Sequence, residues 1–158
     1  NLSAYLAFDR IIACGGSWMV KSDLINEGKF DEVTRLAREA VNTMLGFKVA
    51  HIGINNDNED EARKVAGIFG TMFGFAVKEG NSSIFAGDGI ESNKSQGLGA
   101  KGHIGISTLS IKRAIAYLKR CGFEFNESSV KKNPKGEMVA IYLKDEIGGF
   151  AVHLVQSK

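Results

Sequence analysis

The sequence predicts an α+β protein whose larger part consists of two tandem β-α-β-β-β modules. The main observation is a repeat: residues 51–54 and 103–106 both read His-Ile-Gly-Ile. After each copy come a polar turn, an amphipathic helix pattern, a Gly-Phe pair and several short strand patterns. A repeat at this spacing indicates duplicated structural units, here residues 48–95 and 102–157.

The repeated strand has two different faces. Successive side chains of a strand point to opposite faces, so His51 shares a face with Gly53, and His103 shares one with Gly105. The isoleucines occupy the other face, which we expect to carry the following helix. The pattern therefore predicts that the histidines look into a cup enclosed by the two sheets, and that the glycines leave room beside them.

Local patterns place the elements of each module. A helix is expected to begin after Asn58, which with Glu61 resembles a capping box, and to run to about Phe73. The second helix is expected from Ser110 to Cys121. The predicted strands are 48–54, 75–80, 83–87 and 89–92 in the first module, and 102–107, 123–127, 138–144 and 149–156 in the second.

Residues 1–46 lie outside the repeat and are predicted to form a separate domain. Residues 47–158 are predicted to form the second domain. The apolar run 11–14 is typical of a buried strand, and a Gly-Gly-Ser turn follows it. A short helix after Ser22 and a long amphipathic helix ending at Gly46 come next. This succession is typical of the last β-α unit of a (β/α)8 barrel, whose final loops bind phosphate.

Composition limits the class of protein. Of the 158 residues 44% are hydrophobic and 24% charged, which is typical of a globular protein. The net charge of +2 gives no argument for nucleic acid or a membrane surface. No apolar run approaches the roughly 18 residues that span a bilayer, and no signal peptide is recognised. Two cysteines without motif spacing predict a reduced, cytoplasmic protein. Lys131, Lys132 and Lys135 are interpreted as a solvated loop.

Residues 11–20, together with 34–41, closely resemble the C-terminal end of 2-keto-3-deoxy-6-phosphogluconate / 4-hydroxy-2-oxoglutarate aldolases. Lys21 departs from the proline usual there. The resemblance implies that Gly15, Gly16 and Ser17 hold the phosphate of a keto acid or sugar-acid phosphate in a full-length parent. The Schiff-base lysine and the acid/base glutamate of that family lie upstream of this sequence. The chain alone is therefore expected to lack aldolase activity, and its catalytic residues are unknown.

Residues 48–157 resemble the glyoxalase / vicinal-oxygen-chelate superfamily in module order and in the Gly-His-Ile opening at Gly102. That superfamily binds a divalent metal through the first and last strands of each module. The resemblance implies zinc, nickel, iron, cobalt or manganese as the metal, and no nucleotide cofactor. His153, at the last-strand position of the second module, replaces the glutamate that is usual in the superfamily. A one-residue slip in the register of residues 88–93 would turn Glu91 to the opposite face of the sheet. Glu91 is alternatively a base rather than a ligand. The implied ligands are His51, Glu91, His103 and His153.

Several interpretations remain open at this stage. The histidines are alternatively hydrogen-bonded, partly buried residues of the sheet. A noncatalytic module for metabolite binding or oligomerisation needs no metal, whereas a stand-alone glyoxalase, isomerase or dioxygenase requires one. A small-molecule substrate is expected in each enzyme case, with no nucleic-acid or membrane partner. A homo-oligomer is also expected, because the edge strands of such sheets favour partners.

Overall fold

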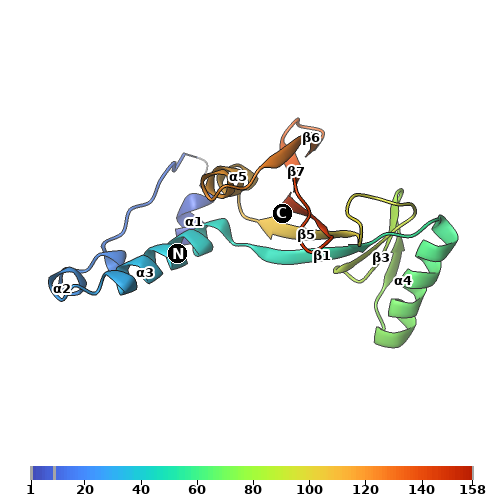
Figure 1. Cartoon of the computed structure of the whole chain (residues 1–158), viewed down its shortest axis with the longest axis horizontal. Coiled ribbons are helices and arrows are strands. Elements are labelled where there is room, and N and C mark those ends of the chain that lie inside the picture. The colour runs from blue at the N-terminus through green and yellow to red at the C-terminus, as the bar shows by residue number, and fades with distance from the viewer. Residues whose placement is uncertain (1, 9, 158) are drawn as a thin grey trace. The chain divides into compact units, whose positions relative to one another are not determined.

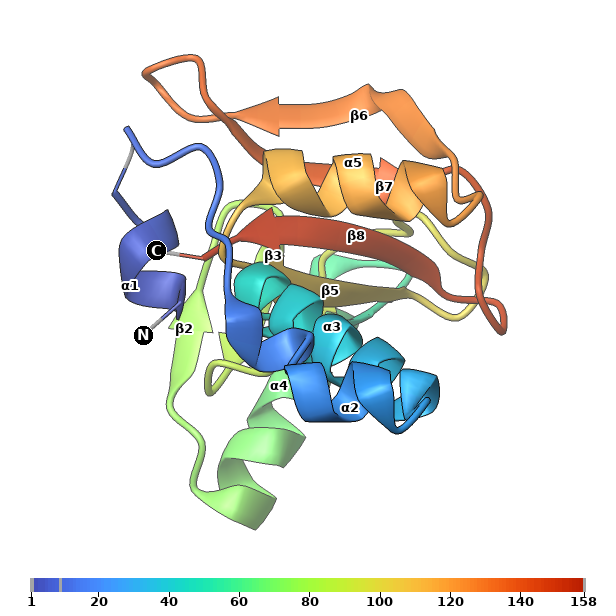
Figure 2. The same ribbon diagram turned by 90° about the vertical axis from the view of Figure 1, so that its left-hand side faces the viewer.

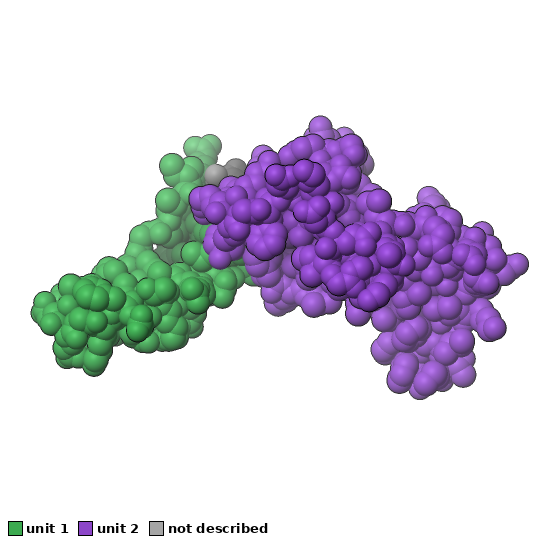
Figure 3. Space-filling model, viewed as in Figure 1, with its two compact units in different colours: residues 1–46 green, residues 47–158 purple. Residues whose placement is uncertain are grey.

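The computed structural model describes residues 2–8 and 10–157, and the chain divides into two compact units (Figure 3). The first unit comprises residues 1–46 and the second residues 47–158. None of the helices in the described part is both long and apolar enough to cross a membrane.

The first unit is helical in its described residues. Its longest helix, α3, has Asp31 and Glu32 in its first turn, where carboxylates interact favourably with the helix dipole. The helix ends at Gly46, whose φ of 58° is left-handed and therefore favours glycine. The helices are α1 (Leu2–Leu6), the 3-10 turn η1 (Ser17–Met19), α2 (Ser22–Asn26) and α3 (Phe30–Leu45).

The strand predicted over residues 11–14 is wrong. These residues have no regular secondary structure, and Ile12 is 91% exposed. A strand is stabilised when its backbone N–H and C=O groups pair with a neighbouring strand. No other strand exists among the described residues of the first unit, so this segment has no partner of that kind within it.

The second unit contains one mixed sheet of eight strands in the order β2-β3-β4-β1-β5-β8-β7-β6. Its first module has the succession β1-α4-β2-β3-β4, and its second has β5-α5-β6-β7-β8. The α+β class and the tandem β-α-β-β-β modules are thus confirmed. The elements are β1 (Lys48–Ile54), α4 (Glu59–Phe73), β2 (Val77–Glu79), β3 (Ser83–Ala86), β4 (Ile90–Asn93), β5 (His103–Thr108), α5 (Ile111–Arg120), β6 (Phe125–Lys132), β7 (Met138–Leu143) and β8 (Ala151–Gln156).

The two modules join through their first strands. β1 and β5 pair antiparallel at the centre of the sheet. Each first strand also pairs in parallel with the last strand of its own module, β1 with β4 and β5 with β8. Read outward from the centre, both halves have the same order of first, last, third and second strand, as duplicated units should.

Each module has one helix that packs over its outer strands. α4 lies along β3 and β4 (Figure 1), where Ala62 and Ala66 form a buried cluster with Ile84 and Ala86. α5 covers β7 and β8 (Figure 2). The expectation that the first isoleucine face carries the following helix is therefore only partly met, because Ile52 on the central strand is 41% exposed.

Candidate metal centre

The register of the central strands places the two repeated histidines on one face of the sheet. His51 on β1 lies opposite Gly105 on β5, and His103 on β5 lies opposite Gly53 on β1. Gly53 also neighbours Glu91 on β4. Side chains of directly opposed residues project to the same face. The first and last strands of the first module therefore direct His51 and Glu91 to the face of the sheet that carries His103 of the second module.

The glycines are required by this arrangement. A Cβ atom on Gly53 would lie 2.0 Å from Cε1 of His103, and one on Gly105 would lie 2.4 Å from Cε1 of His51. The sequence predicted room beside the histidines. The register adds that each glycine accommodates the imidazole of the other module.

The last strand of the second module completes the cluster. His153 lies opposite Gly105, in the same cross-strand row as His51. Its Nε2 atom is 3.0 Å from Nε2 of His51. Oε2 of Glu91 is 3.3 Å from Nε2 of His51 and 3.4 Å from Nε2 of His103. One ligand atom from each of the three histidines lies within 4.8 Å of those of the other two.

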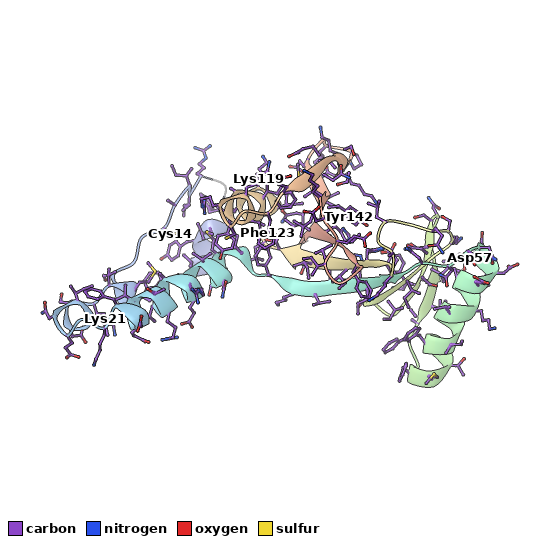
Figure 4. All side chains as sticks on the ribbon, in the orientation of Figure 1. Cys14, Lys21, Asp57, Lys119, Phe123 and Tyr142 are labelled. Carbon is purple, nitrogen blue, oxygen red and sulfur yellow. The ribbon has the colours of Figure 1, made fainter. Side chains whose placement is uncertain are left out.

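These side chains border a cavity of about 540 Å³. His103 and His153 are 5% and 7% exposed, so the cluster lies deep in it. Tyr142 of β7, labelled in Figure 4, lies opposite His153 and also lines the cavity. The remaining walls include polar side chains and one lysine, namely Ser82, Asn93, Ser95, Gln96, Gln156 and Lys131.

Glu91 is held in its ionised form. Burial raises the pKa of Glu91, but hydrogen bonds from His103 and Ser83, with the attraction of His51 and His103 in their protonated forms, outweigh burial and lower it to about 2. The Ser83 hydroxyl donates to Oε1 of Glu91 at 2.8 Å, while Oε2 faces the imidazoles. One carboxylate oxygen therefore has a fixed partner, and the other points into the cavity.

Two of the histidines are held neutral. Burial lowers the pKa of His51, and burial, with repulsion from His51 and His103 in their protonated forms, lowers the pKa of His153 to about 3. Nδ1 of His153 is buried without a hydrogen-bond partner among the described residues. The ring instead stacks on Tyr142, with centroids 4.5 Å apart and planes 14° from parallel. Stacking on Tyr142 and the contact between Nε2 of His153 and Nε2 of His51 together orient the His153 imidazole.

The donor set fits a divalent metal ion. Metal ligands must be deprotonated, and the neutral imidazoles of His51 and His153 and the ionised Glu91 have that form. Two ligand atoms bound at about 2.0–2.1 Å to one tetrahedral zinc ion lie about 3.3–3.4 Å apart. Oε2 of Glu91 has this separation from Nε2 of His51 and of His103, at 3.3 and 3.4 Å, whereas Nε2 of His51 and Nε2 of His153 are closer together, at 3.0 Å. The orphaned Nδ1 is the one unusual feature, because metal-bound histidines ordinarily donate their second N–H.

Sequence reasoning missed two residues of this cavity. Lys131 was interpreted as part of a solvated loop; it is exposed, as expected, but it lies on strand β6 rather than in a loop, and it lines the cavity. Tyr142 was not identified at all. The alternation of residues 138–144 favours a strand, but only the pairing of β7 with β8 shows that Tyr142 lies opposite His153.

The three residues implied in phosphate binding lie in the first unit. Gly15 and Ser17 are exposed in the turn that leads into η1. Gly16 is covered by its own neighbour, since a Cβ atom there would lie 1.3 Å from Cζ3 of Trp18. The turn is present, but η1 has only three residues.

Comparison with known proteins supports both resemblances. A 41-residue segment is 49% identical to the 2-dehydro-3-deoxy-phosphogluconate aldolase of Haemophilus influenzae, which is 26% of this chain and 19% of the aldolase. The chain thus spans about a fifth of the length of the curated relatives it matches. No protein-family model matches.

Two solved structures share the fold of the sheet. A hypothetical protein from Bacillus halodurans aligns with a TM-score of 0.50 and 17% identity, covering 71% of this chain and 95% of its own. Methylmalonyl-CoA epimerase from Mycobacterium tuberculosis aligns with a TM-score of 0.50 and 10% identity, covering 70% and 87%. The second unit therefore has the glyoxalase / vicinal-oxygen-chelate fold. The chain combines this fold with an aldolase-like segment.

Proposed function

We propose that the second unit binds one divalent metal ion through His51, Glu91, His103 and His153, and that its cavity receives a small-molecule substrate. One observation carries this proposal. All three histidines of the chain, which come from three different strands, have ligand atoms within 4.8 Å of one another, and two of them lie beside the Glu91 carboxylate. The polar partners of these imidazoles are one another and the Glu91 carboxylate.

The chemistry follows from the protonation states of the side chains. When bound, the metal ion would supply a Lewis acid that polarises oxygen atoms of a substrate. Glu91 contributes one negative charge at neutral pH, because its pKa is about 2. Burial and the charge of Glu91 raise the pKa of Tyr142, so its hydroxyl keeps its proton and can donate it as a hydrogen bond in the cavity.

Metal analysis of the tag-free chain tests the proposal. Cys14 and Cys121 have free thiols, so both are changed to serine to prevent adventitious binding. After removal of metal with a chelator, cobalt is added and its visible absorption is titrated. We expect one ion per chain, with His103→Ala losing stoichiometric binding. The surface variant Glu146→Gln should bind as the parent does. Absence of binding in the parent contradicts the proposal.

A noncatalytic binding module is the second candidate. The orphaned Nδ1 of His153 favours it, because a metal ligand ordinarily has a partner on its second ring nitrogen. In this case the chain would bind a metabolite in the cavity without metal. The cobalt titration separates the two candidates, since only the first predicts a histidine-dependent spectrum.

We further propose that the first unit is the C-terminal end of an aldolase-type barrel in a longer parent. The 49% identity over 41 residues supports this. In such a parent, Gly15, Gly16 and Ser17 would hold the substrate phosphate. The chain of 158 residues should show no aldolase activity, whereas a protein extended through the upstream barrel should. Turnover by the 158-residue chain would contradict the assignment.

A further inference from the structure

Lys131 is the residue of the cavity that the metal proposal leaves unused. It lies on β6 opposite Ala140, which in turn lies opposite Val155 on β8. Val155 is two positions from His153 and therefore shares its face. The register thus directs Lys131 to the side of the sheet that carries the histidines, in agreement with its place in the cavity wall.

The ammonium group of Lys131 is not committed to a partner. Within residues 2–8 and 10–157 no ion pair or hydrogen bond holds it. The amide groups of the wall are already used: Asn93 donates to Asn55, and Gln96 donates to Asp57. Among the described residues that line the cavity, Lys131 is also the sole lysine or arginine.

The charge balance of the cavity favours an anion. The negative charge of Glu91 and the positive charge of Lys131 cancel, so a bound divalent ion would leave two positive charges there. Positive potential focused in a cavity attracts negatively charged small molecules.

We infer that Lys131 binds the carboxylate of the substrate, and that the cavity selects small carboxylic acids with a further oxygen that faces the histidines. The lysine ammonium is a compact point charge with three donors, which can pair with one carboxylate. This inference names the substrate class of the proposed metal site and rests on that proposal.

Pyruvate is the probe, with pyruvamide as its neutral analogue. Both are titrated into the cobalt-loaded chain, and binding is followed by the change in visible absorption and by calorimetry. We expect Lys131→Met to weaken pyruvate about five- to tenfold, as for loss of a partly solvated charged hydrogen bond. Cobalt affinity and pyruvamide binding should not change. Lys131→Arg should restore most of the pyruvate affinity.

Lys132→Met is the matched control, because it removes the same charge from the neighbouring residue, which is not part of the cavity wall. Equal pyruvate affinity in Lys131→Met and the parent would overturn the inference. So would an equal loss in Lys132→Met, which would indicate a general charge effect. Inorganic phosphate that binds more tightly than pyruvate, with the same dependence on Lys131, would overturn the assignment of a carboxylate.

Failure of the metal proposal can be told apart from failure of this one. If the parent chain takes up no cobalt, pyruvate is titrated into the metal-free chain by calorimetry. Binding that is lost in Lys131→Met but kept in Lys132→Met then supports the role of Lys131. No binding of pyruvate overturns it. The thermal midpoint of each variant is measured to exclude misfolding as the cause of a loss.

Discussion

Gly53 lies directly opposite His103 across the central β1–β5 pair, and the imidazole occupies the space that a side chain at Gly53 would need. Gly105 and His51 repeat the relationship in the other direction. The two repeated tetrapeptides are therefore interlocked, since each supplies the space that the other requires. This explains why histidine and glycine recur two positions apart in both modules.

Gly53→Ala should displace His103. The new Cβ atom would lie 2.0 Å from Cε1 of the ring, too close for any real contact. We expect a loss of about 1–3 kcal/mol in the free energy of unfolding, measured by urea titration, and at least a tenfold loss of cobalt affinity. Gly67→Ala is the control, because nothing lies within 4 Å of a Cβ atom at that helical position. It should leave stability unchanged or raise it by up to about 1 kcal/mol.

Tyr142 should act as a positioning residue for His153 through its ring. Tyr142→Leu removes the stacked aromatic surface, and we expect about a tenfold loss of metal affinity, as for other groups that orient a ligand. Tyr142→Phe keeps the ring and should bind cobalt within about twofold of the parent. A Phe variant as weak as the Leu variant would show that the hydroxyl, not stacking, is responsible.

Acid should destabilise the metal-free chain through His153 and Glu91. The pKa of His153 falls from 6.5 to about 3 in the folded state, and that of Glu91 from 4.5 to about 2. The unfolded chain therefore binds more protons, so the stabilisation is full above pH 6.5 and is lost as the pH falls toward 3. For His153 the loss is on the order of 5 kcal/mol.

Urea unfolding at a series of pH values measures this dependence. His153→Leu should flatten the slope between pH 6.5 and 3, because the most strongly shifted histidine is then absent. The part below pH 4.5 that belongs to Glu91 should remain. A slope that is the same in His153→Leu and the parent would contradict the assignment of the low pKa to His153.

Ser83→Ala should raise the pKa of Glu91. The Ser83 hydroxyl is one of the donors that stabilise the carboxylate, at 2.8 Å from Oε1. The change leaves His103 as the remaining donor, so the pKa should rise above 2 yet stay below 4.5. Titration of the Glu91 carboxyl carbon by NMR in the metal-free chain measures it. An unchanged pKa would show that the hydroxyl contributes nothing.

The repeat at residues 51–54 and 103–106 was sufficient to predict the modules, because period and strand alternation are local properties of the sequence. Alternation also separated the histidine face from the isoleucine face. The face of Glu91 was left open, since it depends on the register of β4 against β1. The roles of Lys131 and Tyr142 depend in the same way on pairing between strands distant in sequence.

The first unit shows the opposite limit. Residues 11–14 have the composition of a buried strand, but a strand requires partners, and the described part of this unit supplies none. Local propensity identified the segment, but propensity does not supply the neighbouring strand with which a strand must pair. The long helix at 30–45, which closes its own hydrogen bonds, was predicted within a residue or two.

The central strand pair divides the proposed ligands evenly, with two from each module. Neither module by itself holds more than half of the coordination sphere. A bound ion would therefore work as a removable cross-link between the two halves of the sheet. The two halves would then be unable to open independently, and amide hydrogen exchange along the β1–β5 seam would slow on metal uptake. Metal binding in the cavity would therefore make the whole sheet more rigid.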